Sequence, residues 1–257
     1  MLVHAGTVPA VRRRRPGRYG PLLASATPLV LLHGFAGTPK HWRRVIGALP
    51  PQRFEARALD LCRVEPLTAD GAAAAVATAV RGRFVLAGYS MGARLALHAA
   101  LAMPERVERL VLVSGTAGIV DARERKARLA ADEELAEEVE RNGIEEFIAR
   151  WAATPLFAGD PPWVRDEVAR EQRDCDTGSI AACLRDLGTA TMAPMWERLG
   201  ELRMDVAVLA GERDPRYVAL ARRLATAIPR AQLTIVAGAG HRLALEAPEA
   251  VAAAIAG

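Results

Sequence analysis

The segment Gly88-Tyr89-Ser90-Met91-Gly92 constrains the fold of this chain more than any other part of its sequence. Residues 83–87 before it predict a short buried strand, and residues 93–103 after it predict a helix that ends before Pro104. A serine between two glycines at a strand-to-helix turn is typical of a nucleophile elbow, because the glycines permit a tight turn that exposes the hydroxyl at the top of a parallel sheet. A G-x-S-x-G match alone is common, so the strand and helix around it carry the prediction.

The groups that a nucleophilic serine needs follow later in the chain. A serine hydroxyl is a poor nucleophile at neutral pH, so it requires a histidine to take its proton and a carboxylate to orient that histidine. Asp214 follows an apolar strand predicted over residues 206–210, and His241 follows one predicted over 233–236. Open parallel sheets form their sites just beyond the carboxyl ends of strands, and the acid precedes the histidine after such an elbow. We therefore predict Asp214 as the orienting acid and His241 as the base for Ser90.

Other residues could fill these roles. Glu212 lies two residues before Asp214 and is the alternative acid, although a solvent-facing or arginine-paired position suits it better. None of the other histidines follows a late strand; they are His4, His33, His41 and His98. His98 lies inside the helix after the elbow, and His41 precedes a predicted helix start, so structural roles are expected for both.

A second loop predicts where negative charge is stabilised. The apolar run over residues 28–32 predicts a central strand, and it ends in His33-Gly34-Phe35-Ala36-Gly37. In this architecture a backbone N–H of such a loop and the N–H of the residue after the nucleophile form an oxyanion hole. These groups would be the N–H of Phe35 and the N–H of Met91. A lone His-Gly pair would otherwise be an ordinary turn.

Composition limits the class of protein. The chain has 257 residues and 51% hydrophobic residues, enough for one large core. Its three cysteines (Cys62, Cys175 and Cys183) show no pairing pattern, and no metal-ligand spacing occurs, so we predict no metal, no cofactor and a reducing cytoplasm. No apolar stretch is long enough to span a membrane.

The basic residues do not predict a nucleic-acid partner. The run Arg12-Arg13-Arg14-Arg15 could begin a signal peptide, but Pro21 and Pro28 interrupt the apolar residues that follow. The net charge is only +4 and aromatic residues are sparse, so the run is better explained as a solvated turn. We expect a small-molecule partner; the sequence does not predict the oligomeric state.

The middle of the chain differs from its two ends. Strands are predicted over residues 54–60 and 107–114, with an alanine-rich helix over 71–80. Residues 118–195 become helical and charged, and after the strand at 206 two more helices are predicted over 219–228 and 248–256. We therefore predict one α/β core formed by residues 1–117 and 196–257, with residues 118–195 as a helical lid over the elbow.

The chain resembles the α/β-hydrolases over nearly its whole length. The resemblance is carried by the elbow, by the loop His33-Gly34-Phe35, and by Asp214 and His241 late in the chain. The resemblance implies an α/β-hydrolase fold with a mostly parallel central sheet flanked by helices and a helical lid insertion. Finer motifs resemble the 2-succinyl-6-hydroxy-2,4-cyclohexadiene-1-carboxylate (SHCHC) synthases of menaquinone biosynthesis. These motifs are residues 88–94, 155–158 and 211–217, with the arginine-rich 123–125 and the segment 173–178.

That second resemblance implies a function for particular residues. The triad would act as a base that removes a proton and triggers elimination of pyruvate from a substrate with several carboxylates. Arginines suit such a substrate because their rigid fork binds carboxylates bidentately. By position, the family's basic substrate-binding residues are matched by Arg125, Arg173 and Arg216, and its pocket aromatics by Tyr89 and Trp151. On a charged helix, however, residues such as Arg125 commonly face water, and a tryptophan on an amphipathic helix is commonly core.

The sequence also departs from that family. Relatives usually carry an Asp-Leu-Pro-Gly-His-Gly loop, whereas residues 60–66 read Asp-Leu-Cys-Arg-Val-Glu-Pro, and Ala93 replaces a usual glycine after the elbow. Three functional hypotheses therefore stay open. They are an SHCHC synthase-like lyase, a serine hydrolase of an ester, thioester or carbon–carbon bond, and an inactive hydrolase-fold binding protein.

Overall fold

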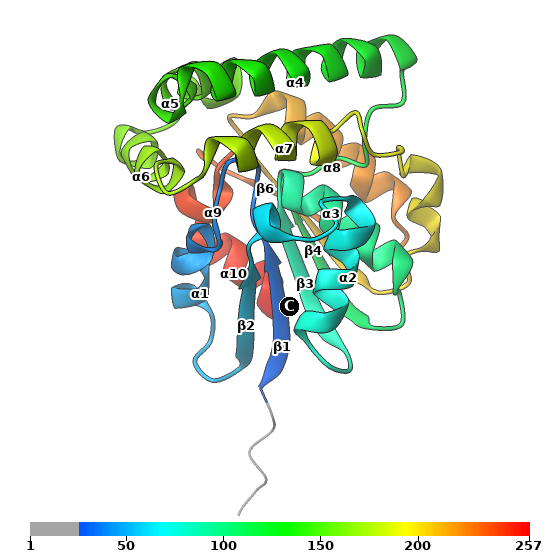
Figure 1. Ribbon diagram of the computed structural model, residues 1–257. Coiled ribbons are helices and arrows are strands. Elements are labelled where there is room, and N and C mark those ends of the chain that lie inside the picture. The colour runs from blue at the N-terminus through cyan, green and yellow to red at the C-terminus, as the bar shows by residue number, and fades with distance from the viewer. Residues whose placement is uncertain (1–25) are drawn as a thin grey trace, which may run out of the picture.

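Six parallel strands form the centre of the computed structural model, which describes residues 26–257 (Figure 1). Their order across the sheet is β2-β1-β3-β4-β5-β6. The strands are β1 (Thr27–Leu32), β2 (Phe54–Leu59), β3 (Phe84–Tyr89), β4 (Val107–Val113), β5 (Asp205–Gly211) and β6 (Ala231–Val236). The sheet confirms the predicted α/β-hydrolase fold class. The arginine run at 12–15 and His4 lie outside the described residues.

Alternating side chains of the central strands enter two separate cores. Val30 and Leu32 of β1 belong to one buried cluster, and Leu29 and Leu31 belong to the other. This alternation follows from the two-residue period of a strand, and both faces are apolar because helices cover both.

Helices cover the two faces of the sheet (Figure 1). One face is covered by α2 (Ala69–Ala79), α3 (Met91–Ala102) and α8 (Pro215–Ala227). The other is covered by α1 (Arg43–Ala48), α9 (Leu243–Glu246) and α10 (Pro248–Ala256). The start of α1 agrees with the helix start predicted next to His41, whereas α9 was not predicted, because a single turn carries too few residues for a periodic pattern.

The strand order reverses between the neighbouring strands β1 and β3. After β1 the chain adds β2 on one side of this pair, and after β3 it adds β4, β5 and β6 on the other side. Ligands of open parallel sheets bind at such a switch point, beyond the carboxyl ends of the strands. The loop after β1 contains Gly34 and Phe35, and the turn after β3 contains Ser90. The fold therefore brings the two predicted halves of the site together.

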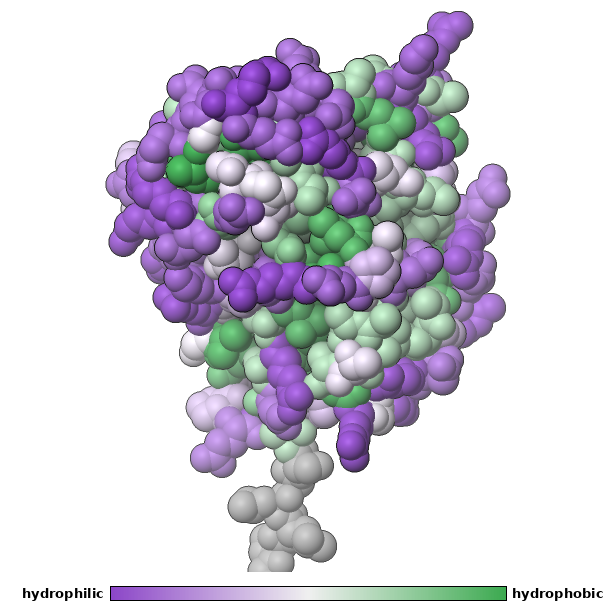
Figure 2. Space-filling model, viewed as in Figure 1, coloured by the Kyte–Doolittle hydropathy of each residue, from purple (hydrophilic) through white to green (hydrophobic). Residues whose placement is uncertain are grey.

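Between β4 and β5 the chain forms a layer of helices above the carboxyl end of the sheet (Figure 1). These are α4 (Ala122–Asn142), α5 (Ile144–Ala152), α6 (Pro162–Gln172) and α7 (Thr177–Leu187). They have their own apolar cluster, which includes Phe147 and Ile180 and also takes in Ala36 from the loop after β1. Their outer side is mainly hydrophilic, as Figure 2 shows at the end of the molecule where α4 lies.

The altered loop after β2 contacts this helical layer. It forms the 3₁₀ helix η2 (Leu61–Arg63), and the Sγ atom of Cys62 lies 3.4 Å from the Sγ atom of Cys183 on α7. No helix in residues 26–257 is both long and apolar enough to cross a membrane.

Candidate active site

The elbow holds Ser90 in a backbone conformation that few residues adopt. Its φ is 53° and its ψ is −109°, directly before the first turn of α3. The flanking glycines permit this turn because the chain passes very close to itself. A Cβ atom on Gly88 would lie 2.2 Å from the carbonyl oxygen of Gly92, and one on Gly92 would lie 2.1 Å from that of Leu32. Each glycine is therefore required by a backbone contact that leaves no room for a side chain.

The three residues predicted as a triad meet above the sheet. His241 Nε2 lies 3.1 Å from Ser90 Oγ, and His241 Nδ1 lies 2.7 Å from Asp214 Oδ2. The other carboxylate oxygen of Asp214 accepts the backbone N–H of Tyr217 at 3.1 Å, at the start of α8. Both oxygens of Asp214 thus have donors, and a helix N-terminus favours its negative charge.

The environment of His241 favours its neutral form. Burial lowers the pKa of His241, and the nearby Arg242 cation also lowers it, whereas the hydrogen bond and charge of Asp214 raise it. The imidazole is 2% exposed. A neutral imidazole bonded to Asp214 through Nδ1–H presents its Nε2 lone pair to the Ser90 hydroxyl, as a general base must.

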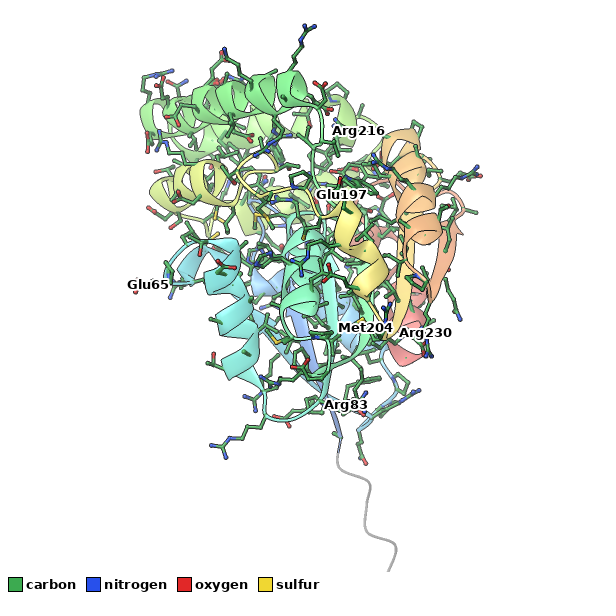
Figure 3. The ribbon with its side chains drawn as sticks, turned by 90° about the vertical axis from the view of Figure 1, so that its right-hand side faces the viewer. Glu65, Arg83, Glu197, Met204, Arg216 and Arg230 are labelled. Atoms are coloured by element: carbon green, nitrogen blue, oxygen red, sulfur yellow. The ribbon has the colours of Figure 1, made fainter. Side chains whose placement is uncertain are left out.

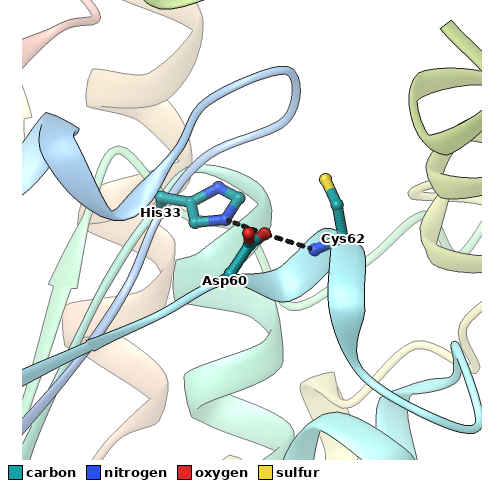
Figure 4. A group of neighbouring side chains, drawn as sticks. All are labelled: His33, Asp60 and Cys62. Atoms are coloured by element: carbon teal, nitrogen blue, oxygen red, sulfur yellow. Dashed lines mark hydrogen bonds and ion pairs between the residues drawn. The ribbon is translucent and has the colours of Figure 1, made fainter. Parts of the chain in front are cut away.

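His33 connects two loops at the edge of the site. Its Nε2 accepts the backbone N–H of Leu61 at 3.0 Å, which leaves Nδ1–H to donate to the carbonyl of Gly34 at 2.8 Å. His33, Asp60 and Cys62 have potential metal-ligand atoms within 4.8 Å of one another (Figure 4). However, His33 Nε2 is engaged by Leu61, and Asp60 Oδ1 accepts the N–H of Cys62 at 3.2 Å. This group is better explained as a hydrogen-bonded support for the loop after β1.

The two predicted oxyanion-hole residues line the same cavity as Ser90. Among the described residues, neither Phe35 N–H nor Met91 N–H donates a backbone hydrogen bond. Gly34 lies against the elbow, since a Cβ atom there would be 3.5 Å from the Cβ of Ser90. Two unpaired N–H groups beside the Ser90 hydroxyl, one of them at a helix N-terminus, would suit the binding of a developing negative charge.

Ser90 opens into a cavity between the sheet and the helical layer. Several aromatic side chains line this cavity. The ring of Phe35 packs edge-on against Trp151 at a centroid distance of 5.1 Å, and Trp151 contacts Phe157 at 5.5 Å. Tyr89 stacks on His41 at 4.8 Å. The predicted Tyr89 and Trp151 both line the cavity.

Arginines that the sequence analysis did not assign also line this cavity: Arg94, Arg128 and Arg242. Arg94, on the elbow helix, is 3% exposed and donates to the carbonyls of Leu187 and Gly188 at 2.8 and 3.2 Å. No carboxylate of the described residues forms an ion pair with Arg94. Burial consequently lowers the pKa of Arg94 to about 10.

The structure places the three predicted arginines outside the cavity lining. Arg125 donates to the carbonyl of Ala190 at 3.1 Å. Arg173 is about half exposed and forms a two-bond pair with Glu145. Arg216 is 69% exposed and lies 3.6 Å from Glu124 of α4 (Figure 3). Arg173 and Arg216 therefore have acidic partners at the surface, and neither faces Ser90.

The alternatives considered for the triad have other partners. Glu212 accepts the backbone N–H of Gly238 at 2.9 Å, and His98 pairs with Asp70 at 2.7 Å. His41 is buried, and its Nδ1 lies 3.8 Å from Glu171 Oε2. A further residue escaped the sequence analysis: Ser114, after β4, donates through Oγ to the carbonyl of His241 at 3.0 Å. A signal existed for Arg94, which is four residues after the nucleophile and thus one helical turn from it on α3.

Comparisons with known proteins show the family of the chain and the proteins that it is similar to. The model described as "Alpha/beta hydrolase family" matches residues 29–254. The 2-succinyl-6-hydroxy-2,4-cyclohexadiene-1-carboxylate synthase of Klebsiella pneumoniae is 31% identical over 241 residues, which cover 89% of this chain and 92% of that protein. A Bacillus subtilis relative is 35% identical over 167 residues, but this match spans only 63% of the chain and 61% of that relative. The solved structure of MenH from S. aureus is 25% identical, covers 93% of this chain and 95% of that one, and has a TM-score of 0.85.

Proposed function

The chain belongs to the alpha/beta hydrolase family, and from this premise we propose that it is an SHCHC synthase-like lyase that eliminates pyruvate from a cyclohexene substrate with several carboxylates. Family membership and the similarity to SHCHC synthases indicate an enzyme of the lyase or hydrolase type. The choice of the lyase is our proposal, because similarity to named synthases does not by itself assign a substrate to this chain.

One observation carries the choice: Arg94 is a buried cation that lines the cavity of Ser90 and has no carboxylate partner among the described residues. A buried charge without a counter-ion is costly, so a site that keeps one is suited to a ligand that brings the missing charge. Arg128 adds a second cation to the same wall. A neutral ester would leave Arg94 uncompensated, whereas a carboxylate would pair with it.

The triad would supply the base. As His241 Nε2 takes the proton of Ser90, the serine oxygen removes a proton from carbon beside an electron-withdrawing group of the substrate. The electron pair of that C–H bond would then shift through the ring and break the C–O bond to the enolpyruvyl group. This group would leave with the C–O electrons as the enolate of pyruvate and take up on carbon the proton that the Ser90–His241 pair has gained, which gives pyruvate. Asp214 stabilises the imidazolium that forms at His241.

The backbone supports the charged intermediate in this proposal. Proton removal beside a carbonyl places negative charge on the carbonyl oxygen, and the unpaired N–H groups of Phe35 and Met91 are the donors available to it. The rings of Tyr89 and Trp151 would hold the substrate ring. We retain residues 118–195 as a lid and residues 1–117 and 196–257 as the core, because α4–α7 provide one wall of this cavity through residues such as Arg128 and Trp151.

The test is direct. The purified protein is incubated with freshly generated pathway substrate, and pyruvate is followed with a coupled dehydrogenase. Release well above the spontaneous rate, lost in Ser90→Ala, supports the lyase. Hydrolysis of nitrophenyl esters without pyruvate release would instead favour a serine hydrolase, and neither activity, together with substrate binding, would favour an inactive binding protein.

A further inference from the structure

Two arginines adjoin the catalytic residues in sequence, one directly before Asp214 and one directly after His241. Both reach the same short turn of the helical layer, residues 157–160, which follows the 3₁₀ helix η3 (Pro155–Phe157). Arg213 Nη1 donates to the carbonyl of Gly159 at 2.5 Å, and Arg242 Nε donates to Asp160 Oδ2 at 2.6 Å. The loop that carries Asp214 and the loop that carries His241 are therefore both hydrogen-bonded to this turn.

We infer that the turn 157–160 is a positioning element for His241, held over the imidazole by Arg213 and Arg242. This inference rests on the proposed function, because it takes His241 as the base. Asp160 and Arg213 act through the loops they hold, so they are positioning residues and not catalytic ones.

The contacts around His241 support a positioning role. The Phe157 ring meets the imidazole edge-on at a centroid distance of 5.8 Å. The Arg242 guanidinium packs on the Phe157 ring, 3.8 Å from its centroid. Ser114 holds the carbonyl of His241 at 3.0 Å from the other side. The turn therefore contacts the imidazole through Phe157, while Ser114, directly after β4, holds the backbone of His241. Catalytic geometry tolerates displacements of only about 0.5 Å.

The ion pair of Arg242 and Asp160 is nearly inaccessible to water. Its side chains are 7% and 2% exposed. The desolvation of two buried charges largely offsets their attraction, so such a pair adds little to net stability. The ion pair instead fixes the position of the turn relative to Arg242, since a displaced turn would leave each charge buried without its partner.

Glu246 completes the network on the other side. Its carboxylate, 4% exposed, pairs with Arg213 and accepts the backbone N–H of Gly240 at 3.0 Å. Gly240 directly precedes His241. Arg213 therefore joins the turn at Gly159 to the peptide before His241, while Arg242 joins Asp160 to the peptide after it.

The pair also acts on the charge of the imidazole. The charged groups that face His241 are Asp214 from the start of α8, Asp160 from the turn and Arg242 from its own loop; the neighbouring side chains Tyr89 and Tyr217 are phenols. Asp160 raises the pKa of His241, and Arg242 lowers it. Removing either charge alone should therefore shift this pKa, and the two shifts should have opposite signs.

The experiment uses the charge-removing variants Asp160→Asn and Arg242→Gln in the full chain. The His241 pKa is measured by NMR titration, with the imidazole signals assigned through His241→Asn, and kcat and KM are measured by pyruvate release. We expect Asp160→Asn to lower the pKa by about half a pH unit and Arg242→Gln to raise it by a similar amount. Asp160→Asn should reduce kcat about 10-fold with little change in KM.

Controls distinguish a positioning role of the turn from the general effect of losing an ion pair. Arg230 and Asp205 form an exposed pair at 2.6 Å, at the amino ends of β5 and β6 and thus at the end of the sheet away from the site (Arg230 is labelled in Figure 3). Asp205→Asn should therefore change neither the pKa nor kcat. Arg242→Lys keeps the charge and should recover most of the kcat that Arg242→Gln loses. If Asp160→Asn does not fold, Arg213→Gln tests the other contact to the turn, the bond from Arg213 to Gly159. Arg213 is partly exposed, and this variant should reduce kcat about 3-fold.

The inference is overturned if Asp160→Asn and Arg242→Gln shift the pKa in the same direction, or if their kcat values stay within 2-fold of wild type, an about 0.4 kcal/mol effect. An Asp160→Asn variant that changes KM alone would also overturn it, because Arg242 would then be a substrate ligand that Asp160 merely masks. Failure of the proposed function has a different signature: the wild type would release no pyruvate, while the opposite pKa shifts could still be observed.

Discussion

Replacing Arg94 with methionine should remove substrate binding while leaving the fold intact. Arg94 is 3% exposed, and burial lowers its pKa to about 10, which corresponds to a cost of about 3 kcal/mol for holding the charge in the folded state. Because the folded pKa lies below the unfolded one, this cost is present in full at any pH below about 10. The substitution removes that cost and also loses two charge-assisted hydrogen bonds, to the carbonyls of Leu187 and Gly188, worth about 1.5 kcal/mol each.

The stability terms of Arg94→Met therefore nearly cancel, whereas its binding terms do not. A charged hydrogen bond to a substrate carboxylate contributes about 3 kcal/mol, so kcat/KM for pyruvate release should fall about 100-fold. Thermal unfolding should shift by no more than about 4 °C. Arg173→Met is the matched control, since Arg173 is exposed and paired with Glu145, and it should change neither quantity appreciably. Near-normal kcat/KM in Arg94→Met, or failure of that variant to fold, would refute the reasoning.

Three other predictions follow from the site. Ser90→Ala should reduce pyruvate release by at least about 10³-fold with little change in melting temperature, and an active alanine variant would mean that the nucleophile is elsewhere. Gly92→Ala should prevent stable folding, measured by thermal unfolding, because its Cβ would lie 2.1 Å from the carbonyl oxygen of Leu32. Gly47→Ala in α1 is the control and should leave the melting temperature nearly unchanged, since no atom lies within 4 Å of the added carbon. Since burial lowers the pKa of His241 from 6.5 and the base acts when neutral, kcat/KM should hold above this lowered pKa and fall only below it; a midpoint above pH 7 would contradict the assignment.

Much of the fold could be predicted because its main elements have strong local patterns. The buried strands β1, β3 and β5 are largely continuous apolar runs, and the long helix α4 lies in the charged segment that was predicted to be helical. The loops that carry Ser90 and Asp214 could be found because they follow β3 and β5, and the loop of His241 because it follows the short apolar run at the end of β6. The α9 helix is too short for periodicity to reveal.

The inward-facing cations could not be predicted in the same way. Arg125 and Arg128 lie three residues apart on α4, so both lie on one side of the helix. The sequence pattern does not distinguish which turn of α4 lies above Ser90. The structure places Arg128 in the cavity lining and gives Arg125 a bond to Ala190. Arg94 was missed because a buried cation contradicts the usual pattern of an apolar helix face.

The acidic partners of the cavity arginines separate their roles. Arg242 has a fully buried partner in Asp160, so its charge is already compensated and its effect on catalysis passes through the turn it holds. Arg128 has Asp132, but burial raises the pKa of that carboxyl, and one of its oxygens is buried without a hydrogen bond. Arg94 has no such partner in residues 26–257. Under the proposed function, a substrate carboxylate should therefore gain most at Arg94, next at Arg128 and least at Arg242, and we expect the anionic end of the substrate to lie against α3, which carries Arg94.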